Sequence, residues 1–305
     1  MATSPQQSNL SISTRDVQRQ FARRGQLADA EFLYGEIAQR MLERLKLIRL
    51  APAVIVDAGC GHGARFEALA QRYPQAQIIG VDHNEQARSR TTGAGTPWWK
   101  RWVTPIKLAN KPKVVCADLA DTGLAPESVD LVWSNLALHW HPAPHDVLRE
   151  WSRLLRPDGL VFFSGWGPAS GQEIRQALAA AKLQTATLPL VDMHDLGDIM
   201  VEQGFADPVM DQETLTLTYD SAQALLNDAR ALGGNPNPAR KASLPSRQWL
   251  DRLLAALNDT RGSDGKLRLT LEVAYGHAWR GAIRQQQGEA RISVQSITRK
   301  PKPAS

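Results

Sequence analysis

A run of alternating glycines directly after an acidic residue is the part of the sequence best suited to binding a ligand. Residues 54–63 read Val-Ile-Val-Asp-Ala-Gly-Cys-Gly-His-Gly. Glycines let the backbone turn tightly and approach a ligand, and the N-terminus of a following helix offers unpaired N–H groups. The spacing G-x-G-x-G, with Asp57 before it, disfavours a pyrophosphate and favours a ligand with a cationic amino-acid group.

Two further acidic residues end apolar runs in the same way. Asp82 ends the run 77–82, at about the spacing from the glycines at which a carboxylate reaches ribose hydroxyls in nucleotide-binding sheets. Asp118 ends the run 114–118. Because open α/β sheets bind ligands at the carboxyl ends of their strands, we expect the three carboxylates to line one site.

Short apolar runs alternate with helical patterns through the first half of the chain, which is typical of a mostly parallel sheet covered on both faces. The second half contains two segments of strand-like alternation, separated by two helical patterns. We therefore predict an α/β fold with a doubly wound, seven-stranded, mostly parallel sheet and a helical lobe inserted between the last two strands. The predicted strands are 53–57, 77–82, 114–118, 129–134, 160–164, 213–219 and 267–275, and the predicted helices are 31–50, 145–155, 171–184, 192–204, 221–232 and 246–258.

The composition, 43% hydrophobic and 22% charged in 305 residues, is that of a globular protein. No apolar run approaches the ~20 residues that span a bilayer, and the N-terminus lacks the apolar stretch of a secretory signal. We expect a cytoplasmic protein without a membrane partner. Two cysteines, Cys60 and Cys116, are too few for a disulfide framework or a four-ligand zinc site, so no metal is predicted.

These motifs together resemble the class I S-adenosylmethionine-dependent methyltransferases, which have a Rossmann-like fold. The resemblance lies in DAGCGHG (57–63), IIGVDHN (78–84), the segment 117–140 that ends in SNLALHW, and LLRPDGLVFFSGWG (154–167). It implies S-adenosyl-L-methionine as cofactor. The implied cofactor-binding residues are Gly59, Gly61 and Gly63 along the methionine moiety, Asp57 near its ammonium, Asp82 with the adjacent His83 at the ribose, Asp118 and Leu119 at the adenine, and Asn135 beneath the sulfonium.

Four later segments resemble the malonyl-acyl-carrier-protein O-methyltransferase family of biotin synthesis. They are NLALHW (135–140), DLGD (195–198), and the segments 215–233 and 269–279. The resemblance implies methylation of the free malonyl carboxylate on an acidic acyl carrier protein. Composition and periodicity, together with this resemblance, divide the chain into a flexible tail (1–20), a helical arm (21–50), a cofactor-binding core (51–219) with a Trp/Lys-rich insertion (91–113), a substrate or lid lobe (220–266), C-terminal strands (267–298) and a tail (299–305).

A carboxylate acceptor needs no general base, because it is already ionised at neutral pH. It needs a cation or hydrogen-bond donors that hold its oxygen in line with the methyl group. The candidates are Tyr34, His139, Trp140 and an unidentified Arg or Lys of the lobe. Packing against the core is the alternative role for Tyr34 and His139.

Other functions remain open from the sequence. A mitochondrial complex I assembly factor family has the same motifs and hydroxylates an arginine of a partner subunit. The cofactor could also be a structural ligand of an interaction module, or the acceptor could be another small molecule. The segment Ser134-Asn-Leu-Ala-Leu-His-Trp140 lacks the Asn/Asp-Pro-Pro-Tyr/Phe turn of enzymes that methylate nucleic-acid bases, which argues against a nucleic-acid substrate.

The net positive charge of the chain is concentrated in one segment. The segment 98–113 contains Lys100, Arg101, Lys107, Lys111 and Lys113 and no acidic residue, which equals the whole net charge of +5. This local charge suggests the hypothesis that the segment meets an acidic carrier protein by electrostatic steering. Its three tryptophans also suit packing against the core, a lid, or contact with nucleic acid or lipid.

Overall fold

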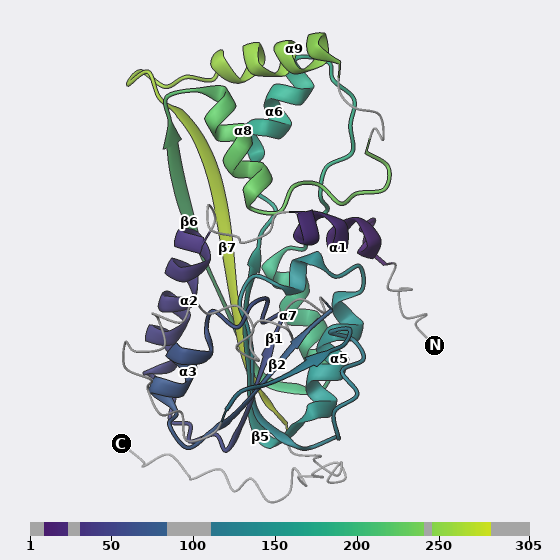
Figure 1. Ribbon diagram of the computed structural model, residues 1–305, viewed down its shortest axis with the longest axis vertical. Coiled ribbons are helices and arrows are strands. Elements are labelled where there is room, and N and C mark those ends of the chain that lie inside the picture. Colours follow the sequence, from purple (N-terminus) through teal and green to yellow (C-terminus); the bar gives the residue numbers. More distant parts are fainter. Residues whose placement is uncertain (1–8, 24–30, 84–110, 241–245, 282–305) are drawn as a thin grey trace, which may run out of the picture.

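The apolar runs of the sequence form a sheet of seven strands in the order β3-β2-β1-β4-β5-β7-β6 (Figure 1). The computed structural model describes residues 9–23, 31–83, 111–240 and 246–281. Strands β1 to β5 pair in parallel, and β7 runs antiparallel to both β5 and β6. This confirms the predicted doubly wound, mostly parallel sheet. The strands are β1 (Val54–Ala58), β2 (Gln77–Asp82), β3 (Lys113–Cys116), β4 (Val129–Ser134), β5 (Leu155–Trp166), β6 (Phe205–Tyr219) and β7 (Leu267–Arg280).

Helices cover both faces of this sheet, because neighbouring residues of a strand point to opposite sides. Ile55 and Phe162 pack into one buried cluster with α2 and α3, whereas their neighbours Val56 and Phe163 pack into another with α5 and α7. In Figure 1, α2 and α3 lie on one side of the sheet and α5 and α7 on the other. The helices are α2 (Glu31–Leu45), α3 (Phe66–Arg72), α5 (Pro144–Leu154) and α7 (Met193–Glu202).

Strands β6 and β7 form a long antiparallel pair that extends from the sheet to the helical lobe (Figure 1). Helices α8 (Ala222–Ala231) and α9 (Arg247–Asn258) lie between these strands in sequence, which confirms the predicted insertion. A third helix, α6 (Gln172–Ala180), joins the lobe by packing on α9, although the sequence placed it in the core. The apolar residues of the lobe continue the cluster around α2.

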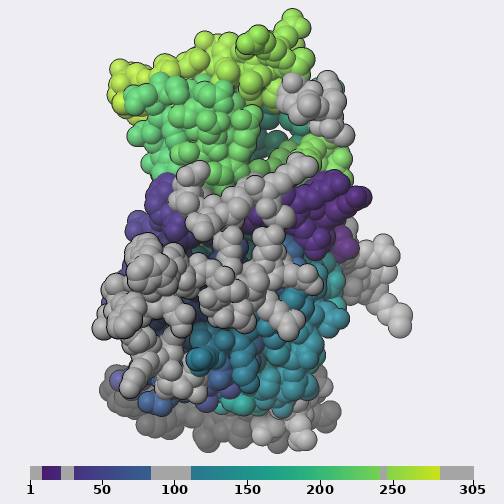
Figure 2. All heavy atoms as spheres, viewed as in Figure 1, coloured from purple at the N-terminus to yellow at the C-terminus, as the bar shows by residue number. Residues whose placement is uncertain are grey.

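The N-terminal region contains a helix where the sequence predicts a flexible tail over residues 1–20. Helix α1 is Thr14–Arg23, and the Ser13 hydroxyl caps it by accepting a hydrogen bond from Asp16 N at 3.2 Å. Val17 and Phe21, one turn apart, pack with Trp140. Figure 2 shows α1 (purple) between the lobe (green) and the core below it. The tail prediction is therefore wrong from residue 9 to residue 20, because α1 has a distant apolar partner.

Several predicted segments fall partly or wholly outside the described residues. The parts outside are residues 1–8 of the N-terminal tail, 24–30 of the helical arm, 84–90 of the core, 91–110 of the Trp/Lys-rich insertion, 241–245 of the lobe, 282–298 of the C-terminal strands and the tail 299–305. Within the described ranges, no helix combines the length and the apolarity needed to span a membrane.

Candidate functional site

A cavity of about 500 Å³ opens at the carboxyl ends of β1 to β4. It is lined by every predicted cofactor-binding residue except Gly63, and also by Tyr34 and Trp140. His139 does not line it. The sheet topology explains why the three carboxylates lie together. Asp57, Asp82 and Asp118 lie at or just after the carboxyl ends of β1, β2 and β3, which are adjacent in the sheet.

The glycine turn after β1 needs glycine for different reasons at different positions. Gly59, Gly61 and Gly63 have φ of +80°, +53° and +72°, a region that side chains disfavour. A Cβ on Gly59 would lie 2.2 Å from the Cβ of Ala137, and one on Gly63 would lie 2.4 Å from the Phe66 ring. A Cβ on Gly61 would meet no described atom within 4 Å. Gly63 therefore packs closely against Phe66, whereas the absence of a side chain at Gly61 leaves space in the cavity.

Asp57 presents a buried carboxylate that lacks a full set of partners. Its side chain is 2% exposed, and Oδ2 has no hydrogen-bond partner among the described residues. Burial, followed by the nearby charge of Asp82, raises the pKa of Asp57 to about 7. Because a buried charge is costly unless it is paired, this carboxylate suits a ligand that carries a positive charge.

Asp82 connects the end of β2 to the glycine turn. Its Oδ2 accepts a hydrogen bond from Gly61 N at 2.9 Å, and its Oδ1 lies 3.8 Å from Nδ1 of His83. Nε2 of His83 is buried without a hydrogen-bond partner in the described part of the chain. Asp82 therefore shapes the glycine turn as well as lining the cavity.

Asp118 is paired with His141, a residue that the sequence did not single out. His141 Nε2 lies 3.0 Å from Asp118 Oδ1, while His141 Nδ1 accepts a hydrogen bond from Ala143 N at 3.0 Å. The proton of the neutral ring must therefore be on Nε2, which donates to Asp118. This hydrogen bond, more than any other contact, lowers the pKa of Asp118. Both residues line the cavity, and no local pattern marks His141.

The turn after β4 is held in an unusual conformation. Leu136 has φ of +54°, which is costly for a residue with a branched side chain. Its N–H donates to Ser164 Oγ on β5 at 3.0 Å, and that hydroxyl donates to Asn135 Oδ1 at 3.0 Å. The Asn135 amide in turn donates to the backbone carbonyl of Tyr34 at 2.9 Å. This network fixes the cavity wall between β4, β5 and α2.

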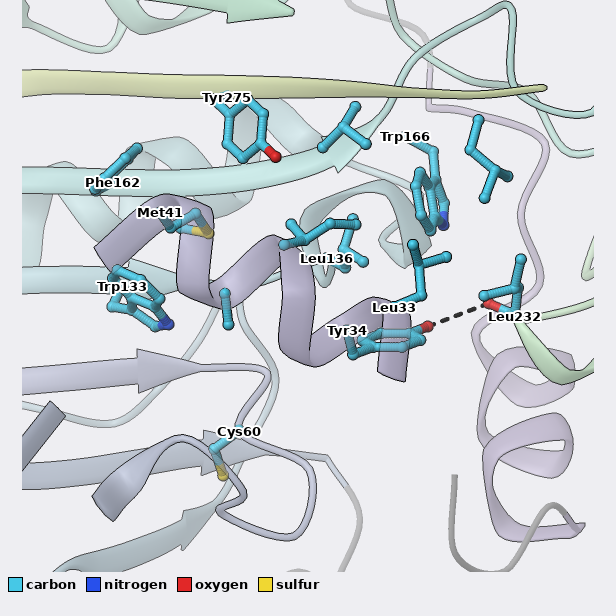
Figure 3. Packing of buried hydrophobic residues seen from close by; sticks show 14 of the residues in the cluster. Leu33, Tyr34, Met41, Cys60, Trp133, Leu136, Phe162, Trp166, Leu232 and Tyr275 are labelled. Carbon is cyan, nitrogen blue, oxygen red and sulfur yellow. Dashed lines mark hydrogen bonds between the residues drawn. The ribbon is translucent and has the colours of Figure 1, made fainter. Parts of the chain in front are cut away.

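Tyr34 and Trp140 line the cavity and also hold neighbouring elements together. The Tyr34 hydroxyl donates to the carbonyl of Leu232 at 3.1 Å, which connects α2 to the lobe (Figure 3). The ring of Trp140 lies 5.5 Å from that of Phe21, edge to face, and so packs against α1. Both residues are buried. A substrate contact and a packing role are therefore compatible at each position.

His139, in the short turn Leu138–Trp140, does not line this cavity. It is buried beside Trp166, whose backbone N–H donates to His139 Nδ1 at 3.4 Å. Burial lowers the pKa of His139 to about 3. The ring of His139 therefore packs against that of Trp140, with centroids 4.7 Å apart, but it does not line the cavity with the other predicted site residues, and it is neutral near neutral pH.

We expect the His139 imidazole to remain neutral throughout the pH range in which histidines normally titrate. Nuclear magnetic resonance of ring-labelled protein should show His139 signals that do not shift between pH 5 and pH 8, with the other histidine signals as references. An inflection of the His139 signal near its ordinary pKa of about 6.5 would contradict its placement.

Two charged residues at the cavity wall were also missed by the sequence analysis. Arg65, just before α3, forms an ion pair with Glu31 at the start of α2, and both line the cavity. Thr14, Val17 and Phe21 of α1 line it as well. Among the described residues, no group of three or more His, Cys, Asp or Glu side chains is placed to hold a metal ion.

Comparison with known proteins agrees with this geometry. A family model described as "Methyltransferase domain" matches residues 56–163. Two solved structures share the fold: the YcgJ protein of Bacillus subtilis (TM-score 0.54, 12% identity, 80% of this chain and 99% of that one) and phosphoethanolamine N-methyltransferase 2 of Haemonchus contortus in complex with S-adenosyl-L-methionine (TM-score 0.52, 13% identity, 87% and 60%).

Two curated relatives are similar over nearly the whole chain. The malonyl-[acyl-carrier protein] O-methyltransferase of Laribacter hongkongensis is 42% identical over 85% of this chain and 86% of its own length. The protein of the same name from Gallionella capsiferriformans is 38% identical over 92% and 96%. Identity at this level extends beyond the methyltransferase domain into the inserted lobe and the last strand. The chain therefore belongs to the malonyl-[acyl-carrier protein] O-methyltransferase family.

Proposed function

We propose that this protein transfers a methyl group from S-adenosyl-L-methionine to the free carboxylate of a malonyl group on acyl carrier protein, as a step of biotin synthesis. The observation that carries the proposal is the similarity to malonyl-[acyl-carrier protein] O-methyltransferases over most of both chains. The cavity supports it, because it combines a glycine turn, an unpaired buried carboxylate and apolar walls in one place.

The cavity residues fit the parts of S-adenosyl-L-methionine in order. Asp57, with its unpaired buried oxygen, suits the ammonium, and the space at Gly61 suits a closely approaching methionine moiety. Asp82 would hold the ribose hydroxyls, with His83 beside it. Asp118 and Leu119, after the edge strand β3, would hold the adenine. Asn135 would support the turn near the sulfonium, and Gly63 would support the glycine turn from behind.

The proposed reaction requires the protein to orient the two reactants and does not require it to transfer a proton. The cofactor supplies an activated methyl group on a sulfonium, and the acceptor carboxylate is ionised at neutral pH. No general base is needed, which agrees with the neutral imidazole of His139 that does not line the cavity. Leu136, Trp140 and Phe21 give the cavity apolar walls that exclude water and direct the acceptor. Tyr34 and Trp140 are the proposed acceptor contacts.

The partner in this proposal is an acidic carrier protein in the cytosol. Support comes from the five basic residues at 98–113, which equal the net charge of the chain. Association steered by such charges weakens as salt is added, because exposed charges are screened beyond about 10 Å at moderate ionic strength. We therefore expect the KM for the carrier-bound substrate to rise with salt.

The proposed activity can be tested with purified protein, S-adenosyl-L-methionine and malonyl-carrier protein. We expect S-adenosylhomocysteine and a carrier-bound ester that is heavier by one methylene group in the mass spectrum. Unloaded and acetyl-loaded carrier proteins serve as controls, because neither has the free carboxylate. Absence of the ester from a protein that binds the cofactor in calorimetry would overturn the substrate assignment. A gain of one oxygen atom on a partner arginine would instead support the hydroxylase alternative.

A further inference from the structure

The charges around the cavity are unevenly distributed. Four acidic side chains line it: Glu31, Asp57, Asp82 and Asp118. Arg65 is the single lysine or arginine among the described residues that line it. Under the proposed function, donor and acceptor each bring a carboxylate into this acidic cavity, and a carboxylate there needs a cationic partner.

Arg65 is held at one end of the cavity by α2. It directly precedes α3, and one of its terminal nitrogens pairs with the Glu31 carboxylate in the first turn of α2. The guanidinium nitrogens lie 3.6 and 3.7 Å from where a Cβ of Gly35 would be, so the guanidinium packs close to this turn of α2. The Arg65 side chain is 21% exposed. Arg65 lies beside Gly35, the residue after Tyr34, and follows the glycine turn in sequence, whereas Asp118 follows the edge strand β3.

The guanidinium retains donors for a second carboxylate. Arginine has five N–H donors in a planar fork that matches two carboxylate oxygens. Within the described part of the chain, the hydrogen bond to Glu31 is the one formed by this side chain. Burial lowers the pKa of Arg65, but an arginine stays charged at neutral pH. Glu31 therefore orients the Arg65 guanidinium without occupying all of its N–H donors.

We propose that Arg65 binds a carboxylate of the reactants, either the methionine carboxylate of the methyl donor or the malonyl carboxylate of the acceptor. Both sources offer the same planar anion, and both belong at the end of the cavity where the methyl group is transferred. The acceptor alternative rests on the proposed function. The donor alternative requires only that the protein binds S-adenosyl-L-methionine.

The variant Arg65→Met separates the two sources. If Arg65 binds the donor, calorimetry should show affinity for S-adenosylhomocysteine reduced roughly 10- to 100-fold, the range expected for a lost charge-assisted hydrogen bond. Affinity for 5′-methylthioadenosine, which lacks the amino-acid part, should then be unchanged. If Arg65 binds the acceptor, both affinities should be retained and the KM for malonyl-carrier protein should rise by a similar factor. Affinities and KM that all stay within about 2-fold of wild type overturn the proposal.

Two further variants control for structural effects. Arg40→Met removes an arginine of α2 that pairs with Glu36 and Glu213 and does not line the cavity, so it should leave both affinities and the KM unchanged. Arg65→Lys keeps the charge and loses the fork, so it should give an intermediate effect if Arg65 binds the carboxylate. Thermal unfolding of each variant identifies any loss of fold.

The calorimetric comparison does not depend on the acceptor. If wild-type protein binds the cofactor but does not methylate malonyl-carrier protein, the proposed function fails while the comparison still tests Arg65. A reduced affinity for S-adenosylhomocysteine alone would then support the donor assignment. An unchanged affinity would overturn the role of Arg65 together with the substrate.

Discussion

Replacing Asp57 by asparagine should weaken cofactor binding and, at the same time, stabilise the cofactor-free protein above neutral pH. Asp57 is buried, and burial followed by the charge of Asp82 raises its pKa to about 7. In an unfolded chain its pKa would be about 4. Because the folded state holds the proton more tightly, the stability present at low pH is lost as the pH rises from about 4 through about 7.

The size of the stability change follows from the shift in the pKa of Asp57. Each pKa unit corresponds to about 1.4 kcal/mol, so ionised Asp57 costs up to about 4 kcal/mol at pH 8 and much less at pH 5. Urea unfolding of Asp57→Asn should therefore show a gain in free energy of unfolding, relative to wild type, that grows by roughly 2–3 kcal/mol between these pH values. Asp251→Asn, on the exposed surface of α9, serves as the matched control for the change of side chain.

Cofactor affinity should fall in Asp57→Asn, although the free energy of unfolding of the cofactor-free protein rises. The asparagine cannot neutralise the ammonium that we assign to Asp57, and a lost charge-assisted contact costs about 1.5–3 kcal/mol, or roughly 10- to 100-fold in affinity. Calorimetry with S-adenosylhomocysteine measures this. Full affinity in Asp57→Asn, with a stability difference that does not depend on pH, would contradict both the buried charge and its proposed partner.

The variants Gly59→Ala and Gly61→Ala should separate stability from binding within one turn. The Cβ of Gly59→Ala would lie 2.2 Å from the Cβ of Ala137, at φ of +80°. Overpacking costs about 1–3 kcal/mol and the strained φ about 1–3 kcal/mol, so we expect a loss of roughly 2–6 kcal/mol in the free energy of unfolding. Urea unfolding measures this loss.

At Gly61 the added methyl group would meet no described atom within 4 Å and would face the cavity. The stability loss should therefore be limited to strain of roughly 1–2 kcal/mol, whereas affinity for S-adenosylhomocysteine should fall by more than 10-fold because the methyl group occupies ligand space. Equal stability losses in the two variants, with cofactor affinity retained in Gly61→Ala, would show that the turn does not face the cofactor.

Local patterns in the sequence were sufficient to predict the sheet and most of the cavity. Apolar runs that end in an acid or a glycine mark strands and their carboxyl ends, and parallel strands bring those ends to one edge. For this reason Asp57, Gly61, Asp82 and Asp118 could be assigned to one site before their contacts were known. The inserted lobe was also predictable, because the periodicity changes from two residues to about 3.6 and back between β6 and β7.

Only the tertiary structure decided which side chains meet across the chain. The pairs Arg65–Glu31 and His141–Asp118 join residues from different elements, and no spacing in the sequence links them. Of the adjacent residues His139 and Trp140, only Trp140 lines the cavity, although both are buried and their rings lie 4.7 Å apart. Helix α1 depends on Trp140 as a distant partner. Periodicity follows from the backbone of each element, whereas these contacts depend on how separate elements pack, which a local pattern does not specify.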